Sequence, residues 1–567
     1  MQKGKGKIAF MNEFIRDAND FSHKDEYKFW TTILIFAALI FSLPYFSFEF
    51  IHKTDTLFHL CRVEGIKEGL LALEIPVRIN GYALNGYGTA DGIMYPDLFL
   101  YIAAFFRILG LSVGLSWNLM WIFMLFAGVF TSWYGFTLWT KNVRAGALAA
   151  ILFTGMYIYQ IIAGDMVGQV AATLFMPPAL ASLVMILRDG KKSYWLMFAL
   201  FGTVIFQNHI ITMLIFCAMA LAICIYYRQA FKNPAQRNAI IKSALFLLLL
   251  NIWRIVPFLY FYETVAFQVN HPSWINSFAD MNMSLKDTLR WHIYLGFPLI
   301  FFTLYFLTKA NIKQQRGFLY SSLGTLFLII ICTRYFPWRF IEETFPFVKV
   351  LFVVQMQQRF LFFGIIFLCI YVGSFLAEKV GDIRKNKLYI LLLLLFISLM
   401  YSTESVVKSL CPQFLPLGYI YSREKLETAP SHTEIQEDYL YADVKFKDLR
   451  KENGEYYGPA DYKTDAKIFD AKKQSTRLEF SYVATKDTKV QVPLFYWKGY
   501  EARNEKGERL NLSSGEHRFM EVEVPKGEGR VYLHYAGLPI FRICDIVSLV
   551  ALAAFVGLWR REWKTYG

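Results

Sequence analysis

The sequence has few charged residues and few cysteines for its length. Asp, Glu, Lys and Arg make up 18% of the 567 residues, against about 25% in a typical soluble domain, which argues against a soluble globular protein. The seven cysteines include no CxxC pair, and five of them lie in apolar runs. Neither a dense disulfide framework nor a zinc or thiol redox centre is therefore expected. The first apolar run is followed by no small-residue cleavage site, which argues against a removed signal peptide.

Apolar residues are abundant instead, at 55% of the chain, with 18% aromatic. Runs of about 20 apolar residues recur over most of the first 400 positions, and each is long enough to cross a hydrocarbon layer of about 30 Å. We predict an all-α polytopic membrane protein with about twelve transmembrane helices. Between 96 and 139 two apolar runs occur where the flanking charges allow an odd number of crossings. We expect Tyr95 to Leu111 to be short, broken or interfacial, and 116–139 to be the full span.

The positive charge follows the same pattern. A net charge of +14 would favour nucleic acid in a soluble protein, but here Lys and Arg cluster in short segments between apolar runs, so the excess indicates topology. We expect no nucleic-acid partner. The chain is predicted to lie in the cell membrane as a multi-pass protein with its basic N-terminal segment in the cytoplasm. The later clusters, which should also face the cytoplasm, lie at 141–144, 188–192, 228–242, 309–316, 379–387 and 560–564.

A change in composition at Ser402 divides the chain. The polar segment 402–540 alternates apolar and polar residues at 477–482 and 530–535, which is typical of strands. We predict an extracytoplasmic C-terminal β-sandwich that either caps the protein or binds a glycan or acceptor. The expected domains are a basic segment 1–28, a transmembrane domain 29–401, the β domain 402–540, and a final transmembrane helix with a cytoplasmic tail, 541–567.

The outer loop 51–95 has the residues best suited to chemistry. From Thr54 to Leu71 the pattern predicts an amphipathic helix on the outer membrane surface, with Asp55, His59 and Arg62 on one stripe. A carboxylate at a helix start is stabilised in its ionised form by the free N–H groups and the dipole. Asp55 is thus suited to accept a proton, or it only caps the helix.

Three further residues lie at expected outer turns. Asp165, between two apolar spans, is costly so near the hydrocarbon unless it functions. It is expected to position an acceptor, bind a divalent ion with Asp55, or cap the next helix. His209 either functions similarly or satisfies backbone groups. Arg359 lies where an outer loop enters an apolar helix, and there it binds a lipid phosphate or anchors the chain at the interface.

The order of several short motifs resembles a known bacterial family. They are Asp55, Phe58-His59-Leu60, Pro76-Val77-Arg78, Gly86-Tyr87-Gly88 and Tyr95-Pro96. Together they resemble the membrane proteins labelled 6-pyruvoyl-tetrahydropterin synthase-related, a family close to the YfhO-like proteins and within the GT-C superfamily of polytopic glycosyltransferases. Pterin chemistry itself is disfavoured, because a pterin synthase clusters histidines on zinc and the nine histidines here are scattered.

The resemblance implies a GT-C-like fold and transfer of a sugar from a polyprenyl-phosphate-linked donor to an extracytoplasmic acceptor, such as a cell-wall polymer or glycolipid. The acidic catalyst of the first outer loop would be Asp55, acting as base, with Asp165 as the second acidic candidate. The donor phosphate would be bound by Arg359, Arg62 and Arg78. No cofactor is certain and a divalent metal ion is possible. Residues that position the acceptor or the loop would be His59, Tyr87, Tyr95, Asp97, His209 and Gln355.

Two non-enzymatic functions remain open at this point. A transporter or flippase of lipid-linked sugars would use the same outer sites but would need charged groups along a path through the membrane. A scaffold would use its β domain to hold other envelope enzymes.

Overall fold

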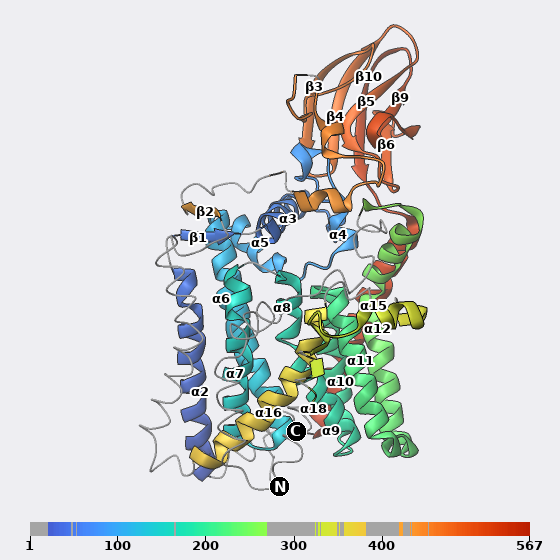
Figure 1. The fold of residues 1–567 in the computed structure, drawn as a ribbon. Coiled ribbons are helices and arrows are strands. Elements are labelled where there is room, and N and C mark those ends of the chain that lie inside the picture. The colour runs from blue at the N-terminus through green and yellow to red at the C-terminus, as the bar shows by residue number, and fades with distance from the viewer. Residues whose placement is uncertain are drawn as a thin grey trace.

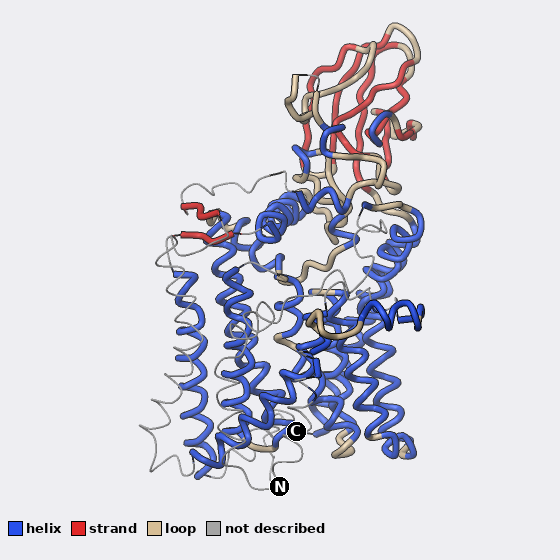
Figure 2. The backbone as a smooth tube through the Cα atoms, viewed as in Figure 1, coloured by secondary structure: helices blue, strands red, loops and turns tan. Residues whose placement is uncertain are grey.

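The computed structural model of the protein describes residues 21–46, 49–52, 54–163, 166–268, 324, 327, 328, 330–348, 351, 357–380, 419–422, 431, 434–451 and 453–566. A bundle of helices occupies one end and an antiparallel β domain the other, with short helices and loops between them (Figures 1 and 2). The start of α2 (Phe21–Ser42) and the end of α18 (Pro539–Tyr566) lie at the end of the bundle away from the β domain. A mostly helical chain with a C-terminal antiparallel sheet is thereby confirmed.

Four stretches of the described chain are long and apolar enough to cross a membrane. They are α6 (Val113–Thr140), Val167–Leu187, α12 (Pro234–Thr264) and Pro539–Arg561 of α18. The stretch Val167–Leu187 consists of α8 (Val167–Thr173) and α9 (Met176–Leu187). The other helices of the bundle are α7 (Val143–Ala163), α10 (Trp195–Asn208), α11 (Ile210–Tyr226) and α16 (Leu361–Val380), and a short α15 (Trp338–Thr344) lies beside them. The total of about twelve crossings stays a prediction, because 269–323 and 381–418 lie outside the described residues.

The expected short helix before a full span is confirmed. α5 (Leu100–Ile108) has 9 residues, and α6 after it has 28. The bundle packs closely where small residues let two backbones approach. A Cβ on Gly135 of α6 would lie 2.4 Å from the backbone nitrogen of Pro178 in α9. A Cβ on Gly373 of α16 would lie 2.8 Å from the carbonyl oxygen of Ala145 in α7. Glycine at these helix contacts is typical of packing in membranes.

The β domain consists of two antiparallel sheets that share one core. The order in the larger sheet is β3-β4-β10-β6-β7 and in the smaller β5-β9-β8. The predicted alternation is seen in β4 (Arg477–Ala484) and β10 (Gly527–Tyr535), whose inward residues Phe480 and Val531 pair directly and are fully buried. The remaining strands are β3 (Lys467–Gln474), β5 (Thr488–Phe495), β6 (Tyr500–Asn504), β7 (Arg509–Leu510), β8 (Leu512–Ser514) and β9 (Phe519–Val524).

The loop 51–95, which is predicted to lie outside the membrane, forms the layer between the bundle and the β domain. It contains α3 (Thr54–Leu71), the 3-10 turn η2 (Leu84–Gly86) and α4 (Asp91–Met94), and it is preceded by β1 (Glu49–His52). β1 pairs antiparallel with β2 (Tyr419–Ser422), which comes from the segment assigned to the β domain. The loop also shares a hydrophobic core with the β domain, so that these two parts of the chain form one unit.

The helix expected at Thr54–Leu71 is present, but it does not lie on the surface. Phe58 and Ile66 are buried, as are the polar His59 and Arg62 of the predicted stripe. The covering elements are α5 and the 3-10 helix η10 (Glu434–Tyr439), where Tyr439 stacks on Phe58 at 5.4 Å between ring centroids. An interfacial position was expected because the sequence does not reveal that the β-domain segment covers α3.

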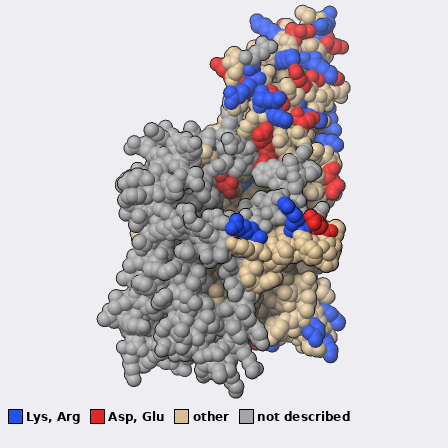
Figure 3. Space-filling model, viewed as in Figure 1, with Lys and Arg blue, Asp and Glu red and all other residues tan. Residues whose placement is uncertain are grey.

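The described surface separates charged from uncharged regions (Figure 3). Lys, Arg, Asp and Glu gather on the β domain, whereas the described part of the bundle on this face shows a broad area with few charges. Large apolar side chains are exposed on α12 and α18, including Leu245, Leu248, Leu549 and Leu552. Such a surface is stable when it faces lipid.

Candidate functional site

Asp55 lies where the start of α3 meets the start of α8. Its Oδ2 accepts a hydrogen bond from the backbone N–H of Met166, at 3.3 Å. Met166 precedes α8 in a left-handed conformation, with φ of +53°, and no side chain caps that helix. The carboxylate therefore satisfies a backbone donor at the start of a neighbouring helix.

Arg359 lies in the 3-10 turn η7 (Gln357–Phe360), close enough to Tyr95 and Asp55 for their charges to interact. Only 6% of its surface is exposed, and its Nε and Nη1 have no hydrogen-bond partner among the described residues. Burial lowers the pKa of Arg359, and the charges of Tyr95 and Asp55 oppose that shift. A guanidinium stays charged, so its buried donors are unfavourable while unmet, and an anion would satisfy both the donors and the charge.

Tyr95 and His209 complete this side of the site. Their rings lie 5.9 Å apart, and His209 begins α11 by accepting the Thr212 N–H at Nδ1, at 3.1 Å. The hydroxyl of Tyr95 lies over Gly168, where an added Cβ would be 2.9 Å from it. Burial, followed by the charge of Asp55, raises the pKa of Tyr95 to about 12. Tyr95 therefore keeps its proton and can donate it in a hydrogen bond.

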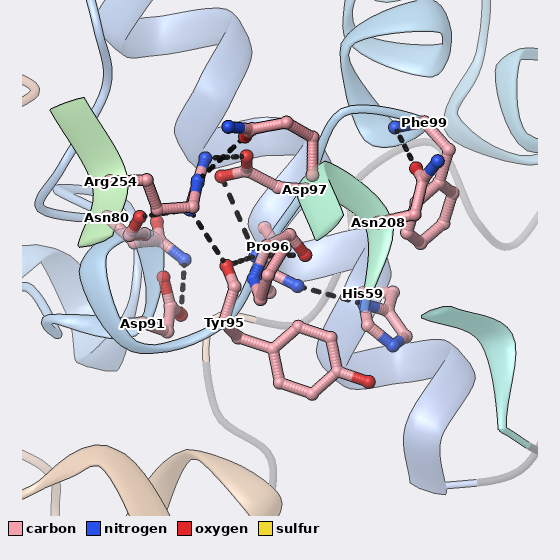
Figure 4. A network of polar contacts seen from close by, with 12 residues as sticks. His59, Asn80, Asp91, Tyr95, Pro96, Asp97, Phe99, Asn208 and Arg254 are labelled. Atoms are coloured by element: carbon pink, nitrogen blue, oxygen red, sulfur yellow. Dashed lines mark hydrogen bonds and ion pairs between the residues drawn. The ribbon is translucent and has the colours of Figure 1, made fainter. Parts of the chain in front are cut away.

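A buried ion-pair network lies directly behind Tyr95 (Figure 4). Arg62 lies 3.6 Å from one oxygen of Asp97, and Arg254 of α12 lies 2.5 Å from the other. Arg62 also donates to the carbonyl of Tyr95 at 2.7 Å, and Arg254 donates to Gln207 at 2.9 Å. The network joins α3, α10 and α12, and it fixes the backbone that carries Tyr95.

Two other predicted residues hold the loop in place at a distance from Asp55. Arg78 makes a bidentate pair with Asp545 of α18, at 2.6 and 3.1 Å, which ties the loop to the last helix. Tyr87 is buried in the β-domain core, with its ring 4.7 Å from that of Phe519. The structure thus brings Asp55, His59, Tyr95, His209 and Arg359 together, with Arg62 and Asp97 behind them, and places Arg78 and Tyr87 elsewhere.

Asp165 and Gln355 lie outside the described residues, so both stay predictions. No group of three or more His, Cys, Asp or Glu side chains within the described ranges is arranged to hold a metal ion. The six described cysteines form no disulfide.

Two residues at the site, Asp438 and Arg254, were not among those predicted from the sequence. Asp438 of η10 lies close enough to Asp55 for the two charges to interact; burial, then Glu437, then Asp55 raise its pKa to about 7. Nothing in the polar run around Asp438 distinguishes it from its neighbours. Arg254 did carry a signal, because a charged residue inside an apolar run is usually paired or functional.

Comparison with known proteins gives only partial likenesses. No family model matches the chain. An 86-residue stretch, 15% of the chain, is 34% identical to the uncharacterized protein YfhO of Bacillus subtilis, of which it spans 10%. Among solved structures, the oligosaccharyltransferase AglB of Archaeoglobus fulgidus, in complex with an inhibitory peptide and a dolichol-phosphate, overlaps 72% of this chain and 61% of its own, at 11% identity and a TM-score of 0.37. ArnT from Cupriavidus metallidurans overlaps 68% and 79%, at 12% identity and a TM-score of 0.29. At these values the function has to be argued from the site.

Proposed function

We propose that this protein is a membrane glycosyltransferase of the GT-C type, which transfers a sugar from a polyprenyl-phosphate carrier to an acceptor hydroxyl outside the membrane. The observation that supports it most is that Asp55, at the start of α3, is close enough to the buried guanidinium of Arg359 for their charges to interact. Burying an arginine with unmet donors is unfavourable unless an anion completes the site.

The two groups suit the two charges that form during sugar transfer. Asp55 accepts the proton of the acceptor hydroxyl as its oxygen forms a bond to the anomeric carbon. The bond from that carbon to the phosphate oxygen breaks, and the lipid phosphate leaves with the electron pair. Arg359 stabilises the negative charge that collects on the phosphate. A single displacement of this kind inverts the anomeric configuration.

The surrounding residues support this arrangement in different ways. Tyr95, His59 and His209 border the site, whereas Arg62 and Asp97 hold the backbone of Tyr95. Arg78 and Tyr87 hold the loop against α18 and the β domain. We propose that the N-terminus lies in the cytoplasm and the β domain outside, with a cell-wall polymer or glycolipid as acceptor. Asp165 and Gln355 remain proposed members of the site, and a divalent ion remains a proposed cofactor.

The test uses purified full-length protein in liposomes, with labelled polyprenyl-phosphate sugar and a bacterial envelope extract as acceptor. Asp55→Asn should abolish covalent labelling of the acceptor, and Arg359→Gln should lower it strongly, with insertion and folding unchanged. Asp443→Asn is the matched control, because Asp443 is an exposed carboxylate of the β domain and pairs with Arg518 at the surface. Full transfer by Asp55→Asn would remove Asp55 from the mechanism. Movement of the labelled lipid across the membrane without transfer would identify a transporter instead.

A further inference from the structure

His59 is held in one protonation state by its neighbour on α3. Its Nδ1 lies 3.3 Å from Nη1 of Arg62, and the side chain is 98% buried. A guanidinium has donors only, so Nδ1 must accept, and the ring proton of a neutral histidine then lies on Nε2. A proton on Nδ1 would place two N–H groups against each other.

Arg62 cannot turn away to release this constraint. The carbonyl of Tyr95 and the carboxylate of Asp97 bind the guanidinium, and Arg254 holds the opposite oxygen of Asp97. The aromatic ring of Tyr95 lies 4.9 Å from the Arg62 guanidinium carbon and packs on it. The tautomer of His59 is therefore set by successive contacts, from Arg254 of α12 to Asp97, from Asp97 to Arg62, and from Arg62 to His59.

Nε2 of His59 is the ring nitrogen that does not contact Arg62, and the neighbouring Tyr95 is close enough to Arg359 for their charges to interact. It has no hydrogen-bond partner within the described part of the chain, although the ring is almost fully buried. The rings of His59 and Tyr95 lie 5.5 Å apart. Figure 4 shows the free edge of His59 and the Tyr95 hydroxyl on the same side of the ion-pair network.

Burial and two neighbouring side chains keep His59 neutral. The neighbours are Arg62 on α3 and His209 between α10 and α11. Burial, followed by the charge of Arg62, holds the pKa of His59 well below its usual range. A neutral Nε2–H still donates a hydrogen bond, whereas its ring has no second site left to accept a proton.

We propose that His59 is locked as the Nε2–H tautomer and donates this hydrogen to a phosphoryl oxygen of the lipid carrier, beside Arg359 and Tyr95. This inference rests on the proposed function and adds a neutral donor to its phosphate site. It also assigns the base to Asp55 alone, because the locked ring offers no free lone pair to an acceptor hydroxyl. Arg62 and Asp97 then act through His59 as positioning residues.

Two substitutions of His59 test the proposal, because the amide of each new side chain lies near the position of one ring nitrogen. Glutamine at position 59 places an N–H near the position of Nε2, whereas asparagine places its amide near the position of Nδ1. Undecaprenyl phosphate is titrated into the purified full-length protein in detergent micelles. We expect the affinity of His59→Gln for undecaprenyl phosphate to stay within about threefold of the wild type. The affinity of His59→Asn should fall by at least about tenfold, which corresponds to the loss of one hydrogen bond to a charged group. Equal binding by the two variants, whether strong or weak, would overturn the proposal.

Two further measurements separate the remaining interpretations. Inorganic phosphate at millimolar concentration should compete with the lipid if the headgroup makes the contact, and a failure to compete would place the lipid elsewhere and overturn the proposal. Nitrogen NMR of ¹⁵N-histidine protein in lipid should give, for the signal absent from His59→Gln, a protonated Nε2 and an unprotonated Nδ1. This readout stands even if His59→Asn fails to fold. If the wild type transfers no sugar but His59→Gln and His59→Asn still differ in affinity for the lipid phosphate, the proposed enzyme activity is refuted and the anion site remains.

Discussion

Replacing Asp97 by asparagine tests the ion-pair network most directly. Asp97 lies between Arg62 and Arg254, and the three side chains are between 1% and 3% exposed. Asparagine has the same shape and keeps one acceptor oxygen, so Asp97→Asn leaves the packing almost unchanged. It removes the only negative charge that contacts both guanidinium groups in the described structure.

The expected cost follows from burial. Removing one partner from a buried ion pair leaves an uncompensated charge and lowers the free energy of unfolding by about 3–5 kcal/mol. The chain contains a matched pair at the surface, Asp443 with Arg518, at 2.6 Å and with side chains 56% and 43% exposed. Water screens that pair, so Asp443→Asn should cost only about 0–1 kcal/mol. The two substitutions change the same chemistry and differ in exposure.

The assay is equilibrium unfolding of the purified full-length protein by SDS in mixed micelles. Combining Asp97→Asn with Arg254→Gln should cost less than the sum of the two single substitutions, since the double variant leaves fewer unpaired charges. Equal costs for Asp97→Asn and Asp443→Asn, or strict additivity in the double variant, would refute the argument that the network is held by buried charge.

Two other substitutions test the packing around Tyr95 and the raised pKa of Asp438. Gly168→Ala puts a Cβ 2.9 Å from the Tyr95 hydroxyl and 3.0 Å from the carbonyl oxygen of Asn208, so the rate of sugar transfer should fall about 10–100-fold. The control Gly557→Ala, whose Cβ meets open space, should leave the rate unchanged. An unchanged rate in Gly168→Ala would show that Tyr95 does not have to be positioned by this contact. Asp438 has a pKa raised to about 7, so the folded protein keeps a proton that the unfolded chain loses near pH 4. Its contribution to stability is therefore lost as the pH rises from about 4 to about 7. Thermal unfolding across this range should show the wild type losing stability relative to Asp438→Asn, and parallel curves would contradict the shift.

The parts of the fold that follow from local pattern were predictable. The α3 helix, the short α5 before the long α6, and the strands β4 and β10 each rest on hydrophobic period or on length, which neighbouring residues determine. The burial of α3 did not follow, because η10 (Glu434–Tyr439) comes from the C-terminal segment of the chain and no local pattern links the two. Long-range contacts of this kind depend on the whole topology.

The sequence predicts which residues lie near the site better than it predicts what each of them does there. The cations Arg62, Arg78 and Arg359 share the same charge and the same expected side of the membrane, and in the sequence only Arg359 stands out, because it precedes an apolar helix. The structure separates them by their partners. Arg62 contacts Asp97, and Arg78 makes a bidentate pair with Asp545.

Arg359 differs from the other two in what its burial requires. A buried cation with a carboxylate in contact is compensated within the protein, and such a pair gives weak evidence of function. Arg359 is equally buried, but two of its nitrogens have no hydrogen-bond partner in the described structure, and no ion pair to it is seen there. Its nearest charge influences are Tyr95, which keeps its proton, and Asp55, which already accepts the Met166 N–H. Because unmet buried donors are unfavourable and the protein interior selects against them, the most economical compensation is an anion that arrives from outside the chain. Of these three cations, Arg359 is for this reason the one whose unmet donors a bound lipid phosphate would best satisfy.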